Sequence, residues 1–130
     1  MKYFFSLILL ILSSVVGLKV QAQTYPDKPI KLIVPFPAGG TVDVLARKTA
    51  HAMEIGLKQP IVIDNRTGAN GAIAVETVMR APPDGYTMLF NSASMTINQV
   101  IYPNLRYNTL RDFVPISEAM AQESYLLLVK

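Results

Sequence analysis

The residues best suited to hold a small molecule lie in one glycine-rich stretch, IVPFPAGGTVD, at positions 33–43. Within this stretch, two prolines and two glycines separate an apolar run from an expected helix. Unpaired backbone N–H groups and the positive end of the helix dipole meet where a helix begins, so such a turn favours an anion. A P-loop or a dinucleotide loop needs glycine and lysine spacings that AGGTVD lacks. The stretch is therefore interpreted as a turn for a carboxylate ligand or as a simple tight turn.

Each candidate side chain has two interpretations, one with a ligand and one without. Asp43 falls in the first turn of the expected helix, where it gains from the dipole and can pair with Arg47; alternatively it contacts an amine or hydroxyl of a ligand. Ser92, Ser94 and Thr96 offer hydroxyls to a carboxylate, and as caps of a later helix they need no ligand.

Other kinds of chemistry are poorly supported. The chain has one histidine, His51, and no cysteine, so no metal set and no nucleophile with a base beside it can be assembled. We expect a surface position for His51, no metal, no cofactor and no catalysis. The net charge of +3 falls to +1 if Lys2 and Lys19 are removed with a leader peptide, and no basic cluster indicates nucleic acid.

Short β-branched runs alternate with stretches of helical spacing along the chain. Helices are predicted over 42–57, 72–80 and 95–101, and strands over 30–36, 60–65, 86–90, 113–117 and 125–129. This alternation predicts an α/β fold with an open, mostly parallel sheet and helices on both faces. Three loops that follow strands, PFPAGGTVD, NRTGANG and NSASMT, should then present backbone N–H groups at one edge.

The first 22 residues are typical of a secretory signal peptide, with Lys2 before an apolar run and small residues at Val20 and Ala22. Cleavage after Ala22 is expected, leaving positions 23–130 as one α/β lobe and a periplasmic location; a membrane anchor is the alternative. The other end stops in the apolar run Tyr125–Val129, a predicted strand. We therefore expect the chain to be the front part of something longer.

Four motifs in register carry a family resemblance: YPDKPIKLIVPFPAGGTVDVLAR, VIDNRTGANG, APPDGYTMLF and YNTLRDFVPIS. Together they resemble the periplasmic substrate-binding receptors of tripartite tricarboxylate transporters, the Bug receptors. The resemblance implies the first lobe of a two-lobed, type II-like binding protein that closes over a di- or tricarboxylate, an acidic amino acid or an aromatic acid. It implies a monomer that hands its solute to membrane partners and catalyses nothing.

The resemblance also implies which residues of this chain contact the ligand. They lie in the three loops and at the aspartate of a GGxxD pattern: Phe36, Ala38, Gly39, Gly40, Asp43, Gly71, Ser92 and Ser94. Thr67 and Asn70 stand where the family usually has proline and glycine, which bears on the rigidity of the second loop. Family members are much longer, so a second wall of the cleft would be missing and the short chain should bind weakly or not at all. The alternative function is a small α/β enzyme that uses a nucleotide or a similar anion.

Overall fold

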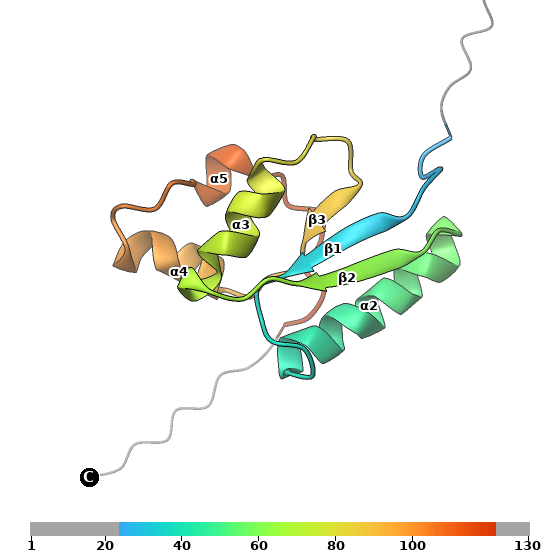
Figure 1. Cartoon of the computed structure of the whole chain (residues 1–130), viewed down its shortest axis with the longest axis horizontal. Helices are drawn as coiled ribbons and strands as arrows, with labels where there is room; N and C mark the ends of the chain where they lie inside the picture. The colour runs from blue at the N-terminus through green and yellow to red at the C-terminus, as the bar shows by residue number, and fades with distance from the viewer. Residues whose placement is uncertain (1–23, 122–130) are drawn as a thin grey trace, which may run out of the picture.

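A computed structural model describes residues 24–121, which contain a three-stranded parallel sheet (Figure 1). The strands are β1 (Ile30–Val34), β2 (Ile61–Asn65) and β3 (Thr87–Leu89), in the order β2-β1-β3. Ile33 of the central strand lies opposite Asp64 of β2 and Leu89 of β3. The predicted parallel sheet is therefore confirmed.

Four α-helices and one short 3-10 turn connect or follow the strands: α2 (Thr41–Leu57), η2 (Ala69–Gly71), α3 (Ala72–Met79), α4 (Ser94–Ile101) and α5 (Thr109–Asp112). The three predicted helices correspond to α2, α3 and α4, and each bound lies within one residue of the expected position. Helix α2 continues through Gly56 and ends at Leu57, where Lys58 takes a left-handed conformation with φ of 54° and donates its N–H to the Glu54 carbonyl. No helix among residues 24–121 is long and apolar enough to cross a membrane.

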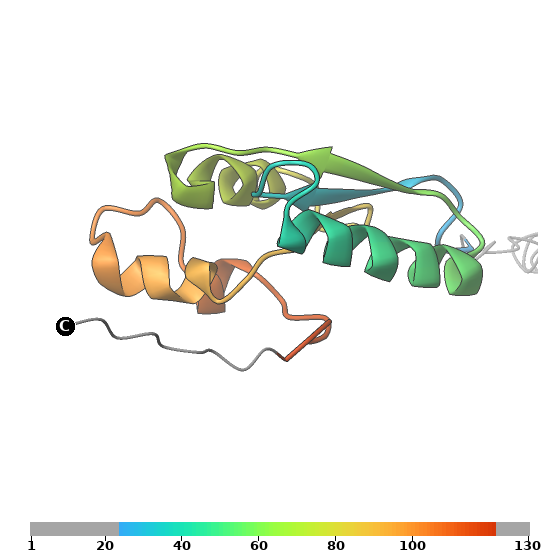
Figure 2. The same ribbon diagram turned by 90° about the horizontal axis from the view of Figure 1, so that it is seen from below.

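The two faces of the sheet bury different side chains. Alternate residues of β1 pack with Ala46 and Ala50 of α2 in one cluster, and Met88 joins them from β3. The next residue of β3, Leu89, packs instead against a second cluster around Val75 of α3. Figure 2 shows α2 running along the strands, with α4 and α5 lying together away from it. Helices therefore cover both faces, as predicted.

Ala74 and Met120 show where the core lies and where it ends. Ala74 is fully buried, because a small side chain lets α3 approach the sheet closely. Met120, in contrast, is 47% exposed.

The predicted strand at 113–117 is wrong. These residues form no ladder with any strand in the described range, and Val114 and Ile116 are 89% and 78% exposed. Pro115 cannot donate a ladder hydrogen bond, and β-branched residues favour a strand only where a partner strand is present. The predicted signal peptide and the predicted strand at 125–129 lie outside residues 24–121.

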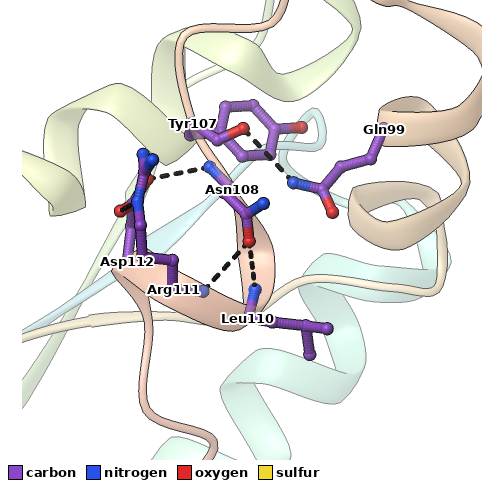
Figure 3. Close-up of polar contacts among 6 residues, drawn as sticks. All are labelled: Gln99, Tyr107, Asn108, Leu110, Arg111 and Asp112. Carbon is purple, nitrogen blue, oxygen red and sulfur yellow. Dashed lines mark hydrogen bonds and ion pairs between the residues drawn. The ribbon is translucent and has the colours of Figure 1, made fainter.

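Helix α5 lies in a segment predicted to be irregular. The Asn108 side chain accepts hydrogen bonds from the N–H groups of Leu110 and Arg111, both at 3.0 Å, and Asp112 accepts from the Asn108 N–H at 2.8 Å (Figure 3). This reciprocal capping starts a helix that is too short to show a periodic apolar pattern.

Candidate functional site: the carboxyl edge of the sheet

The three predicted loops follow the carboxyl ends of the three strands. Because β1, β2 and β3 are parallel and in register, these ends lie at the same edge of the sheet. The N-cap residues of α2, α3 and α4 are Gly40, Gly71 and Ala93, and none provides a side-chain cap. By contrast, α5 is capped by Asn108. Three helices therefore begin at this edge, and at none of them does the side chain of the N-cap residue accept a hydrogen bond from the first backbone N–H groups.

Backbone donors are most open at the start of α2. The N–H of Val44 makes the first helical hydrogen bond, to the Gly40 carbonyl at 2.9 Å. Thr41, Val42 and Asp43 precede it in the helix, so their N–H groups have no carbonyl one turn back to bond. Asp43 is buried, so the N–H groups of the exposed Thr41 and the half-buried Val42, with the positive end of the dipole of a 17-residue helix, form a donor set suited to a carboxylate.

Asp43 is the centre of a hydrogen-bond network at this edge, and it is only 1% exposed. Its Oδ2 accepts from the Arg47 Nε at 2.9 Å and from the Gly39 N–H at 2.8 Å. Its Oδ1 accepts from the Asn65 Nδ2 at 2.9 Å. The predicted pairing of Asp43 with Arg47 is confirmed. Three protein donors therefore hold the carboxylate in place.

The same contacts keep Asp43 ionised. The hydrogen bond from Arg47, and after it those from Gly39 and Asn65, hold the pKa of the Asp43 carboxyl far below its ordinary value. Hydrogen bonding outweighs the opposing effect of burial. The network therefore contains a fixed negative charge that is matched by Arg47 throughout the neutral range.

The remaining residues predicted in the first loop have different exposures. Ala38 and Gly39 are exposed, Gly40 is half-buried, and Phe36 packs against the core next to α2. The Phe36 carbonyl accepts from Asn65 Nδ2 at 2.9 Å. The N–H of Gly39 is bonded to Asp43, and that of Gly40 to the Pro37 carbonyl at 3.2 Å. These two glycines therefore shape the loop, and the open N–H groups belong to Thr41 and Val42, which follow them.

In the second loop, Gly71 lies close to the end of β1. Its φ of +87° favours glycine, and an added Cβ would come within 3.3 Å of Pro35. The neighbouring Asn70 donates its side-chain N–H to Asn98 Oδ1 at 2.8 Å, and Asn98 donates to the Asn70 carbonyl at 2.9 Å. Thus the second loop contacts both β1 and α4.

The third loop presents hydroxyl groups at its surface. Ser92 is exposed and Ser94 is half-buried, and their Oγ atoms lie 2.9 Å apart. Ser92 Oγ also accepts from the Ser94 N–H at 3.3 Å, while Ser94 and Thr96 lie inside α4. Ser92 thus satisfies one backbone group at the start of α4, as a capping role predicts, and its hydroxyl remains accessible.

Three asparagines of this edge were missed as functional candidates: Asn65, Asn70 and Asn98. Asn65 directly follows an apolar strand, at the end where ligands bind in parallel sheets, and that position was a usable signal. Asn98 lies three residues after Met95 in α4, in phase with the buried face. The available signal was a polar residue at a helix position where the spacing calls for an apolar one.

Two hollows among the described residues lie elsewhere. One, of about 490 Å³, is formed by α4, α5 and the segment between them, and a second, of about 350 Å³, lies between α2 and residues 119–120. None of the eight predicted ligand-binding residues lines either hollow. His51 is on the surface, 3.8 Å from Glu54, and residues 24–121 contain no group of acidic and histidine side chains suited to a metal ion.

A comparison with known protein families identifies the family of this chain. The model of the tripartite tricarboxylate transporter family receptor matches residues 45–130. The chain belongs to this receptor family. Residues 45–130 include α2 beyond its first turn and the second and third loops, so most of the edge described above lies within the family match.

Curated relatives of the receptor family agree with this assignment. The chain is 43% identical over 100 residues to Protein BugT of Bordetella pertussis, covering 75% of this chain and 31% of BugT. It is 40% identical over 106 residues to a UPF0065 protein from the tcbD-tcbE intergenic region of Pseudomonas sp., covering 82% and 32%. The chain thus spans about a third of the length of these relatives.

Solved structures confirm the fold of the receptor family. A structure described as a periplasmic transporter matches 72% of this chain with a TM-score of 0.69 and 41% identity, over 32% of its own length. MatC from Rhodopseudomonas palustris, solved with bound malate, matches 70% of this chain with a TM-score of 0.65 and 34% identity, over 31% of its length. The α/β fold of residues 24–121 is therefore shared with these two proteins.

Proposed function

We propose that residues 24–121 form one wall of a cleft that binds a small carboxylate, in a receptor that serves a tripartite tricarboxylate transporter. The observation that carries this proposal is the start of α2, where the N–H groups of the exposed Thr41 and the half-buried Val42 have no helical partner, beside the exposed Gly39. MatC, a structural relative with malate bound, supports the ligand class. The family description supports the transport role.

Within this proposal the predicted site residues have distinct roles. The loop backbone around Ala38, Gly39 and Gly40 shapes the surface next to the open donors, and Ser92 and Ser94 supply hydroxyl donors from the third loop. Gly71 allows close approach of the second loop. Asp43 acts through the loop that it holds, because its carboxylate is buried and accepts three hydrogen bonds from the protein.

Recognition by one wall favours weak binding. Small-molecule sites normally bury most of the ligand surface, and the loops described here contact a ligand from one side. We therefore expect dissociation constants of about 1 mM or weaker for this chain, corresponding to about −4 kcal/mol. No group at this edge supplies a nucleophile with a base beside it, so we propose a binding role without catalysis.

The test is an NMR titration of the isotopically labelled 130-residue protein with malate, citrate, glutamate and benzoate. The expected result is a saturable shift of amide signals at residues 38–43, 71 and 92–94, with little change in α5. Methyl esters of the same acids, which lack the charge, serve as matched controls and should shift these signals far less. The proposal would be overturned if no carboxylate moved these signals, or if ATP or NAD moved them at lower concentration.

The location is a further part of the proposal. The structural relative described as a periplasmic transporter supports export of this chain. The leader would be cleaved after Ala22. In the periplasm the receptor would act as a monomer and deliver its solute to the membrane components of the transporter.

A further inference from the structure

Asn98 is one of two polar residues that are buried among residues 24–121, the other being Asp43. It lies on α4 and is 5% exposed. A buried side-chain amide is costly unless both its donor and its acceptor are used. The cost of burying Asn98 therefore depends on whether its side-chain donor and acceptor both have partners.

Both polar groups of the Asn98 side chain bond to a single residue, Asn70, which lies 28 positions earlier. Oδ1 accepts from Asn70 Nδ2 at 2.8 Å, and Nδ2 donates to the Asn70 carbonyl at 2.9 Å. A rotated Asn98 amide would place oxygen against oxygen and nitrogen against nitrogen. The reciprocal pattern therefore allows one orientation and joins the second loop to α4.

The segment that Asn98 holds has an unusual backbone. Four consecutive residues have positive φ: Gly68 at 113°, Ala69 at 46°, Asn70 at 52° and Gly71 at 87°. Asparagine tolerates the left-handed region better than most residues, whereas alanine does not. Such a segment persists only where its surroundings hold it. On one side Gly71 lies against Pro35 at the end of β1, and on the other side Asn70 is bonded to Asn98.

We propose that Asn98 is a positioning residue, which fixes the second loop relative to the third loop and so preorganises the carboxylate-binding wall. The Asn70 side chain adds to this attachment by donating to Asn98 Oδ1. Helix α4 begins at Ser94, so a bond from α4 to residue 70 determines the spacing between the hydroxyls of the third loop and the backbone of the second. This inference rests on the proposed function for its binding consequence, but not for its effect on the loop.

Three substitutions separate the contributions. Asn98→Ala removes both hydrogen bonds. Asn70→Gly keeps the left-handed backbone and the carbonyl acceptor and removes only the bond from the Asn70 side chain. Gln99→Ala is the matched control, because Gln99 is an amide on the same helix whose Nε2 donates to the Tyr107 carbonyl at 3.2 Å, away from the second loop.

The first measurement is amide hydrogen exchange of the ligand-free 130-residue protein. Asn98→Ala should speed exchange at residues 68–74 by about tenfold or more relative to β1, as expected when buried hydrogen bonds are lost, and Asn70→Gly should have a smaller effect. Gln99→Ala should leave this ratio unchanged. If Asn98→Ala changed all amides equally, or no more than Gln99→Ala, the attachment of the loop would be overturned.

The second measurement is the malate titration repeated on each folded variant. Asn98→Ala should weaken malate binding by about tenfold, and Gln99→Ala should not, because preorganisation contributes directly to affinity. Unchanged affinity in an Asn98→Ala protein with a faster-exchanging loop would overturn the positioning role. If the unsubstituted protein bound no carboxylate, the proposed function would fail, whereas the exchange data would still decide whether Asn98 holds the loop.

Discussion

The carboxylate of Asp43 and the side-chain amide of Asn65 join the start of α2 to the end of β2, with Nδ2 of Asn65 2.9 Å from Oδ1 of Asp43. The same Nδ2 donates to the Phe36 carbonyl, and Arg47 Nη2 lies 3.4 Å from Asn65 Oδ1. Two adjacent loops of the proposed wall are thus connected through one buried carboxylate, 22 residues away in sequence from its amide partner. This contact leads to the first prediction.

Asp43→Asn should destabilise the protein and loosen the first loop. An amide at this position removes the charge that Arg47 pairs with, and its NH2 group faces either the Gly39 N–H or the Asn65 Nδ2, donor against donor. A lower urea midpoint with an unchanged slope, together with shifted amide signals at residues 38–40, is the expected result. Glu76→Gln is the control, since its pair with Arg80 is on the surface and such pairs contribute about 0–1 kcal/mol. Equal midpoints for Asp43→Asn and Glu76→Gln would show that the network contributes no more to stability than a surface ion pair does.

Stability should fall in acid because of two aspartates. The pKa of Asp43 is held far below its ordinary value by Arg47, and the pKa of Asp112 is lowered to about 2, first by the hydrogen bond from Arg111 and then by that from the Asn108 N–H. A carboxyl whose pKa is lower in the folded protein stabilises it above the unfolded pKa, about 4, and this stabilisation is lost as pH falls through the folded pKa.

Urea denaturation between about pH 6 and about pH 2 would measure this loss. The free energy of unfolding should decline below about pH 4, and Asp43→Asn should decline less steeply than the unsubstituted protein. Asp112→Asn would measure the second contribution separately. A pH profile of Asp43→Asn that parallels the original would contradict a lowered pKa at this position.

Gly39→Ala and Gly56→Ala should change stability in opposite directions. Neither added Cβ meets an atom within 4 Å, but Gly39 has a φ of +80° and Gly56 lies inside α2. Alanine at position 39 should cost about 1–2 kcal/mol because of the left-handed backbone. Alanine at position 56 should stabilise by about 0.4–1 kcal/mol, since it restricts the unfolded chain without strain.

Calorimetric or chemical unfolding of the two glycine variants gives the comparison, and the malate titration adds a functional readout. Gly39→Ala should also weaken malate binding, whereas Gly56→Ala should not. Equal changes in stability, or unaltered binding in both variants, would argue against a shaped first loop.

Cleavage of the leader peptide is testable directly. Expression of the whole chain in a Gram-negative host should yield a protein whose N-terminal residue is Gln23, recovered by osmotic shock. Ala22→Arg should slow processing, because the peptidase selects small residues next to the cleavage site. A product that retains Met1 and stays with the membrane would favour the anchor.

Much of the fold was predictable because its signals are local. The spacing of apolar residues in α2, the β-branched runs of β1 and β2 and the turn residues between them depend on near neighbours in sequence, and parallel pairing follows from their alternation. The segment at 113–117 shows the limit of this approach. Its residues favour a strand, but a strand also needs a partner strand with a free edge. Pro115 has no backbone N–H to donate to such a partner.

By itself the sequence determined the strands β1 to β3, the helices α2 to α4, their parallel sheet and the edge at which the loops lie, because these follow from periodicity and turn chemistry. Only the tertiary structure decided how the polar side chains of that edge are used. Asp43 could contact a ligand or the protein, and the approach of Asn65 from 22 residues away supplies a third donor to its buried carboxylate. Asn98 and Asn70 form a pair only because the fold brings α4 beside the second loop. Hydrogen bonds need distances near 3 Å, which a pattern along one chain does not specify between residues so far apart.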